Sequence, residues 1–438
     1  MNDQFLVAVV GAGPAGLFGA RELANAGAHV VVFNRDVKPG GLAEYGIYPN
    51  KHIMKEGLRR QFRGVLDNPN LDYYGNVSVG AQGDLSLDDL RALGFDAILV
   101  TVGAQGTKWL GLPGEHLEGV YHAKDVVYFY NNLPPYSQKS FRFGKRCAVV
   151  GAGNVMVDIA HYLISEQKVD EVIAIVRRGP TEVKFDKKEM GHIIANLDLA
   201  ALDEDLAHVT PIMQAVNQDP EAARASILES KPKADPKTSE TKFRFEFLAS
   251  PLQLIGDDQG RLSQIEVEDN LLVIKDGDTK AKGTGNKRLI DVETVIFAIG
   301  DKVDESFGLP VQWNEFIKNT EPKFPVEGVS YESTIEGVFV GGWSRQASTG
   351  LVGYARKDGT NAAKAVLQYL QTKSASGARL ETVTEKVNGL NKPIVTKENI
   401  KRLEAVEASV AQTRGLEEFK FASNEEMLAA MELIETIG

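Results

Sequence analysis

Short apolar runs that end in glycine recur along the chain, and the first of them opens an alternation of strand and helix. Residues 5–10 (FLVAVV) lead into a glycine turn at 11–16 (GAGPAG), a helical stretch follows to about Ala26, and a second apolar run occupies 28–33 (AHVVVF). The order of strand, glycine turn, helix and strand is typical of a βαβ unit, whose strands pair in parallel. The pattern therefore predicts a parallel α/β domain at the start of the chain.

The same alternation returns in the middle of the chain. Residues 147–150 (CAVV) lead into a second glycine turn at 151–156 (GAGNVM), which precedes a helical stretch to about Ser165 and a strand at 171–176 (EVIAIV). Two turns this far apart are not a short-period repeat, so they indicate two separate units. We expect an α/β fold with two doubly wound, Rossmann-like nucleotide-binding domains.

The segment that follows the second unit has a different character. Residues 217–242 are polar and punctuated by proline, which predicts a flexible surface excursion. Residues 243–248 (FRFEFL) and 263–274 (SQIEVEDNLLVI) then alternate between apolar and polar positions. Alternation of this kind predicts antiparallel strands with one face in the core.

Glycine-rich sequence returns near the end of the chain, at 337–343 (GVFVGGW). The tail beyond it predicts two helices, at about 397–412 and 424–436. A first domain that the chain leaves and later rejoins would enclose the second one. We expect the first nucleotide domain to be built from 1–105 and 331–438, and the second domain, 106–330, to be inserted into it.

Length and composition narrow the function classes. A chain of 438 residues corresponds to two or three domains of about 150 residues. The hydrophobic share of 43% excludes a wholly disordered chain, and a formal net charge of −11 argues against a nucleic-acid partner, which needs a basic footprint. No apolar run reaches the ~18 residues of a membrane span, and the first residues lack a secretory pattern, so we expect a cytoplasmic protein.

The single cysteine, Cys147, restricts the redox chemistry. One thiol cannot form an intrachain disulfide, a CxxC pair or a cysteine-ligated iron–sulfur or zinc site, and its apolar surroundings predict a buried structural residue. The seven histidines show no metal-binding spacing, so we expect no metal. Neither glycine turn matches GxxxxGK[ST], the signature of P-loop ATP hydrolysis.

The first glycine turn has the form GxGxxG directly after a strand and before a helix. Glycine permits the tight turn and lets backbone N–H groups approach a pyrophosphate at the helix N-terminus. An acidic residue about 20 positions on normally binds the ribose hydroxyls, but Asn34 stands there. Asparagine can still bond a hydroxyl without the charge-assisted acceptor. The alternative is a turn with a purely structural role.

The second glycine turn carries Met156 in place of the third glycine, which predicts different packing of its helix. The strand after it ends in Arg177 and Arg178. Paired guanidiniums at the position where an acid would select a free ribose hydroxyl are typical of recognition of a 2′-phosphate. The alternative is an ordinary solvated arginine pair.

Several motifs together resemble one known family, the adrenodoxin-reductase type of ferredoxin–NADP reductase, over nearly the full length of the chain. The segments that carry the resemblance are GAGPAGLFGARELA (11–24), PGGLAEYGIYPNKHIMK (39–55), HAKDVVYFYNNLP (122–134), GAGNVMVDIA (151–160), RRGPTEVKFDKKEM (177–190) and GGWSRQASTGLVGYARKDG (341–359). In the second of these the family usually has Pro-Asp-His-Pro. Here the family histidine falls on Lys51, and His52 follows one place late.

The resemblance implies FAD in the first domain and NADPH in the second. For FAD it points to Gly11, Gly13, Pro14, Ala15, Gly16, Asn34, Gly41, Leu42, Gly342, Trp343, Gly350, Leu351 and Val352. For NADPH it points to Gly151, Gly153, Asn154, Val155, Arg177, Arg178 and Glu189. It also places three candidates beside the flavin, Lys51, His52 and Glu189, although the hydride chemistry belongs to the cofactors and requires no protein nucleophile.

The function that the resemblance implies is electron transfer from NADPH through FAD to a one-electron carrier, foremost a ferredoxin. Two alternatives stay open: a flavoprotein subunit that feeds a dedicated partner enzyme, and a nucleotide-binding sensor without turnover. Glutamate-synthase small subunits share the layout but carry an additional cysteine-rich segment. Because the chain is acidic, docking of an acidic ferredoxin needs a local basic surface. The candidates are Arg59, Arg60 and Arg63, and Lys184, Lys187 and Lys188.

Overall fold

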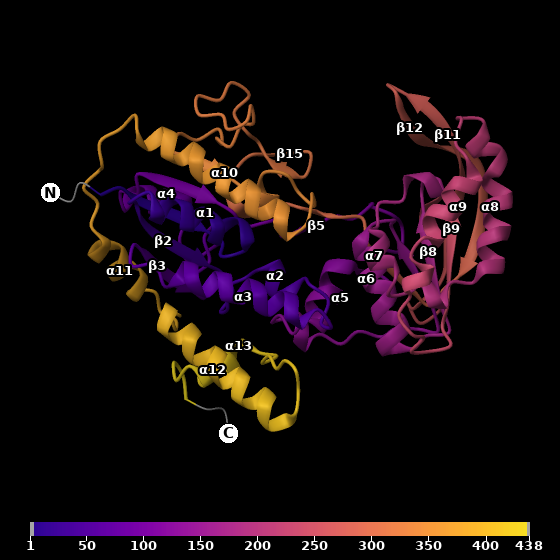
Figure 1. Ribbon diagram of the computed structural model, residues 1–438, viewed down its shortest axis with the longest axis horizontal. Coiled ribbons are helices and arrows are strands. Elements are labelled where there is room, and N and C mark those ends of the chain that lie inside the picture. The colour runs from indigo at the N-terminus through magenta and orange to yellow at the C-terminus, as the bar shows by residue number, and fades with distance from the viewer. Residues whose placement is uncertain (1–3, 436–438) are drawn as a thin grey trace. The chain divides into compact units, whose positions relative to one another are not determined.

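The computed structural model describes residues 4–435, which form two compact units (Figure 1). The first unit comprises Met1–Thr107, Tyr128–Gln138 and Gly300–Gly438, and the second comprises Lys108–Val127 and Lys139–Ile299. The second unit is therefore an insertion in the sequence of the first. Its boundaries differ from the expected 106–330, because residues 128–138 and 300–330 belong to the first unit.

The first unit is built on a five-stranded sheet in which every pair of neighbours is parallel. Its order is β17 (Val338–Val340), β4 (Ala97–Val100), β1 (Leu6–Val10), β2 (His29–Asn34) and β3 (Leu71–Gly75). The strands are almost wholly apolar because both faces of the sheet are covered. The prediction of a doubly wound α/β unit is confirmed here.

Helices cover both faces of this sheet. One face packs on α1 (Pro14–Asn25), α3 (His52–Leu66) and α10 (Val352–Leu370), and the other on α4 (Leu87–Ala92) and α11 (Leu380–Asn388). The α1 and α10 ribbons lie side by side in Figure 1. The carboxyl ends of β1, β2, β4 and β17 meet at one edge of the sheet, where the first glycine turn lies.

The second unit repeats the parallel arrangement. Its main sheet has the order β6 (Val120–His122), β13 (Thr294–Phe297), β7 (Arg146–Val150), β8 (Glu171–Val176) and β9 (Lys242–Phe247). All neighbours pair in parallel. This confirms the second Rossmann-like unit.

The prediction that residues 243–248 form an antiparallel strand is wrong. The segment is β9, which pairs in parallel with β8 at the edge of the sheet. Its apolar positions are buried phenylalanines, whereas Arg244 lies half-buried and binds Glu171 at 2.8 Å. The polar face of β9 is only partly buried, and β9 lies at the edge of the sheet. The sequence of such a strand can therefore alternate between apolar and polar residues even in a parallel sheet.

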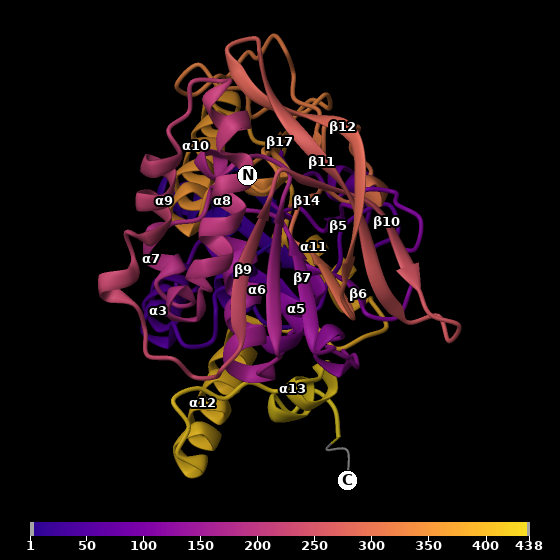
Figure 2. The same ribbon diagram turned by 90° about the vertical axis from the view of Figure 1, so that its right-hand side faces the viewer.

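A separate three-stranded antiparallel sheet contains β10 (Ala249–Gly256), β11 (Leu262–Lys275) and β12 (Asp278–Asp291). The antiparallel strand predicted at 263–274 is thus confirmed as part of β11. The two longest strands, β11 and β12, form an extended hairpin, which Figure 2 labels.

The predicted flexible excursion at 217–242 contains a helix instead, α9 (Pro220–Leu228). The Asp219 side chain accepts hydrogen bonds from two backbone N–H groups of its first turn. An N-cap aspartate followed by proline at the first helical position is a helix-start signal that the polar composition of this segment concealed.

The C-terminal part of the first unit contains α12 (Lys397–Arg414) and α13 (Asn424–Ala430). The first matches its predicted range. The second ends before the predicted 436, a position outside the described residues. The shorter or peripheral elements are α2 (Leu42–Tyr45), α5 (Ala123–Tyr130), α6 (Asn154–Tyr162), α7 (Lys187–Met190), α8 (Leu199–Gln214), β5 (Gly106–Thr107), β14 (Asp301–Lys302), β15 (Val311–Gln312) and β16 (Glu315–Phe316).

Residues 4–435, the described part of the chain, lack two kinds of feature. None of the helices there combines the length and the apolar character needed to cross a bilayer. The same residues contain no group of three or more His, Cys, Asp or Glu side chains arranged to hold a metal ion.

Cys147 lies fully buried in β7, and burial raises the pKa of its thiol to about 12. Because only the thiolate reacts with alkylating agents, we expect native protein at pH 8 to take up iodoacetamide at least about 100-fold more slowly than protein unfolded in guanidinium. Mass spectrometry of the labelled protein measures both rates. Equal rates would contradict the buried position of this side chain.

Candidate functional site

The first glycine turn joins β1 to α1 through backbone contacts that only glycine permits. Gly11 has φ +102°, and a Cβ there would lie 2.6 Å from the carbonyl oxygen of Thr101. A Cβ on Gly16 would lie 1.9 Å from the carbonyl oxygen of Gly11. A Cβ on Gly13 would meet nothing within 4 Å, and no side chain caps the α1 N-terminus. The start of α1 therefore presents backbone donors to an open space, as an anion site requires.

Asn34 holds this turn to the end of β2. Its side-chain oxygen accepts a hydrogen bond from Ala12 N at 3.0 Å, and its amide nitrogen donates to the carbonyl oxygens of Asp36 and Lys38 at 2.8 and 3.2 Å. The side chain is buried, so its bonds go to the protein itself. A bond from Asn34 to a ribose hydroxyl stays a prediction.

A second glycine pair lies directly against the turn. Gly40 and Gly41 have φ +117° and +50°, and Gly40 N donates to the carbonyl oxygen of Ala12 at 2.8 Å. A Cβ on Gly41 would lie 3.0 Å from Gly13 Cα. The backbone before α2, which begins at Leu42, therefore borders the open space beside Gly13.

The segment after β17 approaches the same turn. Gly342 has φ +64°, and a Cβ there would lie 2.6 Å from Ala15 Cβ. Its N–H donates to the Asp358 carboxylate at 2.6 Å, which in turn pairs with Arg345 at 2.6 Å. The Asp358 carboxylate thus holds the 341–343 segment against the first turn of α1. Asp358 lies in the 341–359 segment that carries the family resemblance, but it was not among the predicted site residues.

Trp343, Gly350, Leu351 and Val352 form the start of α10 and the loop before it. The indole of Trp343 donates to the carbonyl oxygen of Thr349 at 2.9 Å, which closes this loop on itself. Gly350 has φ +73°, Leu351 is the N-cap residue without a side-chain cap, and α10 begins at Val352. The uncapped start of α10 is thus a second helix N-terminus with exposed donors in this unit.

Lys51 and His52 lie at the start of α3, where Lys51 is the N-cap residue and His52 is the first residue of the helix. His52 Nδ1 pairs with Glu417 at 2.8 Å. His52 also lines a cavity of about 350 Å³, whose wall includes Lys55 and Asn131. Lys55 Nζ donates to Asn131 at 3.2 Å, and burial lowers the pKa of its ammonium group to about 8.

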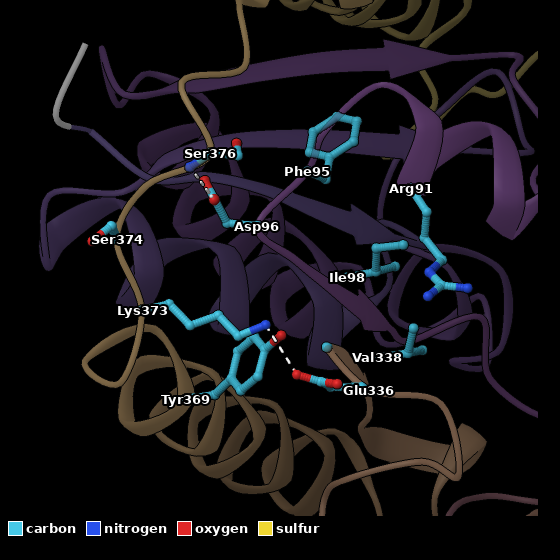
Figure 3. A pocket seen from close by; sticks show the side chains of 11 residues that line it. Arg91, Phe95, Asp96, Ile98, Glu336, Val338, Tyr369, Lys373, Ser374 and Ser376 are labelled. Atoms are coloured by element: carbon cyan, nitrogen blue, oxygen red, sulfur yellow. Dashed lines mark hydrogen bonds and ion pairs between the residues drawn. The ribbon is translucent and has the colours of Figure 1, made fainter. Parts of the chain in front are cut away.

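A second cavity of about 390 Å³ lies at the opposite edge of the sheet, at the amino end of β17 (Figure 3). Its polar lining is satisfied internally: Lys373 pairs with Glu336 at 3.0 Å, and Ser376 N donates to Asp96 at 2.7 Å. Because nucleotides bind at the carboxyl ends of parallel strands, this cavity is not part of the candidate site.

The second unit builds its turn in the same way. Gly151 has φ +147°, and a Cβ there would lie 2.5 Å from the carbonyl oxygen of Ala298. A Cβ on Gly153 would meet nothing within 4 Å, and the α6 N-terminus has no side-chain cap. Met156 is fully buried, so the third position of this motif packs into the core.

The walls of this second open space come from Asn154, the exposed Val155 and the chain after β8. The Asn154 side-chain oxygen accepts a hydrogen bond from Asp186 N at 2.6 Å, and Lys184 N donates to the carbonyl oxygen of Ala152 at 2.8 Å. These bonds fix the 184–186 segment beside the glycine turn.

Arg177 and Arg178 follow β8 at the carboxyl edge of the sheet, and neither forms an ion pair with any residue in 4–435. Asn270 donates to the carbonyl oxygen of Arg177 at 2.9 Å, which anchors the backbone. A hydrogen bond from Lys280 and, to a lesser extent, the positive charge of Arg178 lower the pKa of Asp278. Glu189 lies in α7, where His192 approaches its carboxylate at 3.8 Å. The second turn, the arginine pair and Glu189 therefore belong to one unit.

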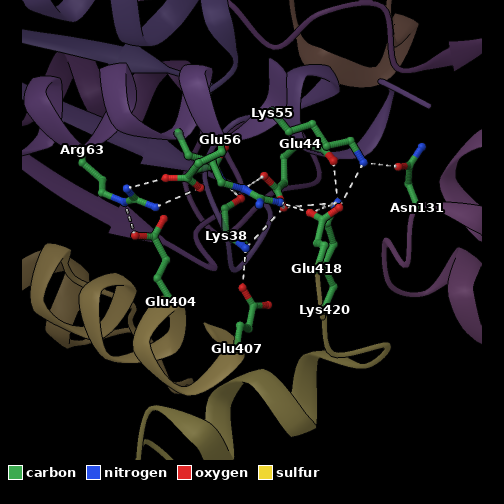
Figure 4. Close-up of polar contacts among 12 residues, drawn as sticks. Lys38, Glu44, Lys55, Glu56, Arg63, Asn131, Glu404, Glu407, Glu418 and Lys420 are labelled. Carbon is green, nitrogen blue, oxygen red and sulfur yellow. Dashed lines mark hydrogen bonds and ion pairs between the residues drawn. The ribbon is translucent and has the colours of Figure 1, made fainter. Parts of the chain in front are cut away.

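The arginines predicted as a docking surface are partly engaged inside the first unit. Arg59 binds Glu44 at 2.6 and 2.7 Å and also Glu418, and Arg63 binds Glu56 and Glu404 (Figure 4). The prediction of a free basic surface at Arg59 and Arg63 is therefore wrong, because both are paired with acidic residues, one of them two helical turns back and others more than 300 positions away.

The remaining docking candidates are more exposed to solvent than Arg59 and Arg63. Arg60, Lys184 and Lys188 are exposed, whereas Lys187, also exposed, pairs with Glu229. A basic surface in the second unit therefore rests mainly on Lys184 and Lys188.

The sequence and the fold were compared with known proteins. The family described as pyridine nucleotide-disulphide oxidoreductase matches residues 5–197. An NADPH:adrenodoxin oxidoreductase of Arabidopsis thaliana is 31% identical over 386 residues, 79% of this chain and 78% of that protein. An NADPH-ferredoxin reductase of Mycobacterium leprae is 26% identical over 457 residues, 96% of this chain and 97% of that protein.

Solved structures agree on the fold. A Mycobacterium tuberculosis FprA structure in complex with NADPH is similar with a TM-score of 0.81 and 24% identity, and covers 98% of this chain and 100% of that one. A thioredoxin reductase of Lactococcus lactis is similar with a TM-score of 0.52 and 17% identity, over 84% of this chain and 100% of that one.

The contrast between Gly13 and Gly16 gives a test of the turn geometry. Gly16→Ala would drive a Cβ into the Gly11 carbonyl, so we expect it to lower the free energy of unfolding by about 2 kcal/mol or more, as overpacking does. Gly13→Ala meets no protein atom, and we expect a change within about 1 kcal/mol. Urea unfolding of both apoproteins measures this, and equal losses would contradict the open space at Gly13.

Proposed function

The chain belongs to the adrenodoxin-reductase type of ferredoxin–NADP reductases, and from this premise we propose which of its residues bind the cofactors and the acceptor. It is an FAD-dependent oxidoreductase that transfers electrons from NADPH through FAD to a one-electron carrier of the ferredoxin type. The resemblance seen in the sequence is thereby confirmed.

The first unit is the proposed FAD domain, and one observation carries this assignment: the open, donor-lined space beside Gly13. Backbone N–H groups at the start of α1 would bind the pyrophosphate, and Gly41 and Gly342 would border it closely. Bound FAD accepts two electrons as a hydride and releases them singly, chemistry that no side chain supplies. The task of the protein here is binding and orientation.

The second unit is the proposed NADPH domain. Its glycine turn offers the same open space at Gly153, and Arg177 and Arg178 supply two positive charges at the end of the adjacent strand. We propose that these guanidiniums bind the 2′-phosphate that distinguishes NADPH from NADH. Glu189, Lys51 and His52 stay proposed neighbours of the nicotinamide and flavin rings on the strength of the family resemblance.

The proposed electron acceptor is a ferredoxin that docks on local positive charge. The net charge of −11 opposes long-range attraction of another acidic protein, so the encounter must rely on exposed cations such as Lys184 and Lys188. A cytoplasmic location stays a prediction from the sequence, since the similar proteins from Arabidopsis thaliana and Mus musculus are named mitochondrial. Fractionation of the source cells tests it.

Replacement of Arg177 and Arg178 by alanine tests the NADPH assignment. A charge-assisted hydrogen bond contributes about 1.5–3 kcal/mol, so we expect the KM for NADPH to rise at least about tenfold for each arginine. The KM for NADH should change little, because NADH carries no 2′-phosphate. Arg142→Ala, at an exposed arginine of the same unit, is the matched control. Equal losses with both nucleotides would mean that the arginine pair is structural.

Charge reversal at Lys184 and Lys188 tests the docking surface. We expect Lys184→Glu/Lys188→Glu to slow ferredoxin reduction about tenfold at low salt, and we expect salt above ~0.1 M to slow the wild type similarly. At saturating NADPH, reduction of ferricyanide should be unaffected, since a small dye needs no docking surface. Lys282→Glu on the β11–β12 hairpin is the control. A rate of ferredoxin reduction that changes neither with the charge reversal nor with the salt concentration would refute the docking assignment.

A further inference from the structure

A cluster of buried charges lies under the Gly40–Gly41 loop, and none of its members is a proposed nucleotide ligand. The cluster, called here the Glu44 cluster, brings together three segments of the first unit (Figure 4). Its members are Lys38, Glu44, Arg59, Glu407, Glu418 and Lys420. Lys38, Glu44, Glu407 and Lys420 are each less than 9% exposed.

Glu44 is the centre of the cluster. Its carboxylate accepts two hydrogen bonds from Arg59, and the ammonium groups of Lys38 and Lys420 each lie 3.2 Å from one of its oxygens. Burial would raise the pKa of this carboxyl, but the three cations hold it well below its usual value. Glu44 is therefore a fixed negative charge that needs its partners, because removal of one partner leaves an uncompensated charge in the protein interior.

Three members of the cluster, Glu407, Glu418 and Lys420, come from the C-terminal part of the chain. Lys420 Nζ donates to the backbone carbonyl of Glu44 at 2.7 Å in addition to its ion pair, and its ammonium group lies 5.0 Å from the Tyr45 ring centroid. Glu407, on α12, accepts a hydrogen bond from Lys38 at 2.5 Å. Through these contacts the C-terminal segment binds both ends of the loop from Lys38 to Tyr45: Glu407 contacts Lys38, and Lys420 contacts Glu44 and Tyr45.

Glu44 is also packed against the glycine pair that borders the proposed pyrophosphate space. A Cβ on Gly40 would lie 2.9 Å from Glu44 Cβ, and Glu44 N donates to the carbonyl oxygen of Gly41 at 3.0 Å. Gly41 in turn lies against Gly13. A displacement of Glu44 would therefore move the glycine pair relative to the first glycine turn.

We propose that Glu407 and Lys420 are positioning residues for FAD: through Lys38 and Glu44 they hold Gly40 and Gly41 in the conformation that borders the pyrophosphate. The inference rests on the proposed FAD site and adds to it a control of flavin affinity by the C-terminal segment. Buried ion pairs often contribute little net stability, whereas they can specify one geometry among several. The geometry of the loop, more than the stability of the unit, is what this cluster supplies.

Two substitutions test the proposal in the full-length apoprotein. Lys420→Met removes the bonds to Glu44, and Glu407→Gln removes one charge at constant shape. We expect the Kd for FAD to rise at least about tenfold for Lys420→Met and about threefold for Glu407→Gln, and the visible circular dichroism of the bound flavin to change. The affinity for 2′,5′-ADP, a probe of the second unit, should stay unchanged.

Lys401→Met is the matched control, because Lys401 lies on α12 and pairs with Asp67 in solvent. We expect it to leave FAD affinity at the wild-type value. Lower melting temperatures of the apoproteins with unchanged FAD affinity and flavin spectrum would overturn the proposal and leave the cluster a structural feature. A wild-type protein that binds no FAD would instead reject the FAD site itself, so the two failures are distinguishable.

Discussion

The close approach of backbone to backbone around Gly13 is the constraint on which the first unit depends. Gly41 and Gly342 both reach the turn or the helix that follows it at distances that leave no room for a side chain. Since these segments adjoin the start of α1 without capping it, its backbone donors stay available. The open space that we propose as an anion site thus results from the absence of side chains at these glycines.

The second unit uses the same open turn but adds charge. Gly153 leaves the space, Asn154 fixes the neighbouring segment through Asp186, and the two arginines after β8 supply positive charge. Backbone dipoles bind any pyrophosphate, whereas guanidiniums distinguish a phosphorylated ribose from a free one. In the proposed sites, the two units therefore share the open glycine turn for affinity, and the arginine pair of the second unit would add selectivity.

The elements that could be predicted from the sequence are those that depend on neighbours in the chain. The glycine turns, the strands beside them and the first tail helix follow from local pattern, and they have the predicted ranges to within a few residues. Glu407 could not be connected to Lys38 in this way, since the two residues are separated by 369 positions. For the same reason Arg59 was predicted to be a surface charge, since its partner Glu418 lies 359 positions away in the sequence.

Other features escaped prediction because one pattern has two physical origins. The alternation in β9 reflects an edge position in a parallel sheet, not antiparallel pairing. Asp358 lies in the 341–359 segment that resembles the family, but its residue type and spacing did not indicate that its carboxylate holds Gly342 in place. Residues that position a backbone segment are therefore harder to predict from sequence than the glycines that the same segment requires.

The most direct test of the account is the stoichiometry of electron transfer. Purified protein with bound FAD is mixed with a limiting amount of NADPH and excess oxidised ferredoxin under anaerobic conditions, and both carriers are followed by absorbance. Because a hydride carries two electrons and ferredoxin accepts one, the account predicts two reduced ferredoxins for each NADPH consumed, with transient bleaching of the flavin. A flavin that NADPH does not bleach, or NADPH oxidation without reduced ferredoxin, would contradict it.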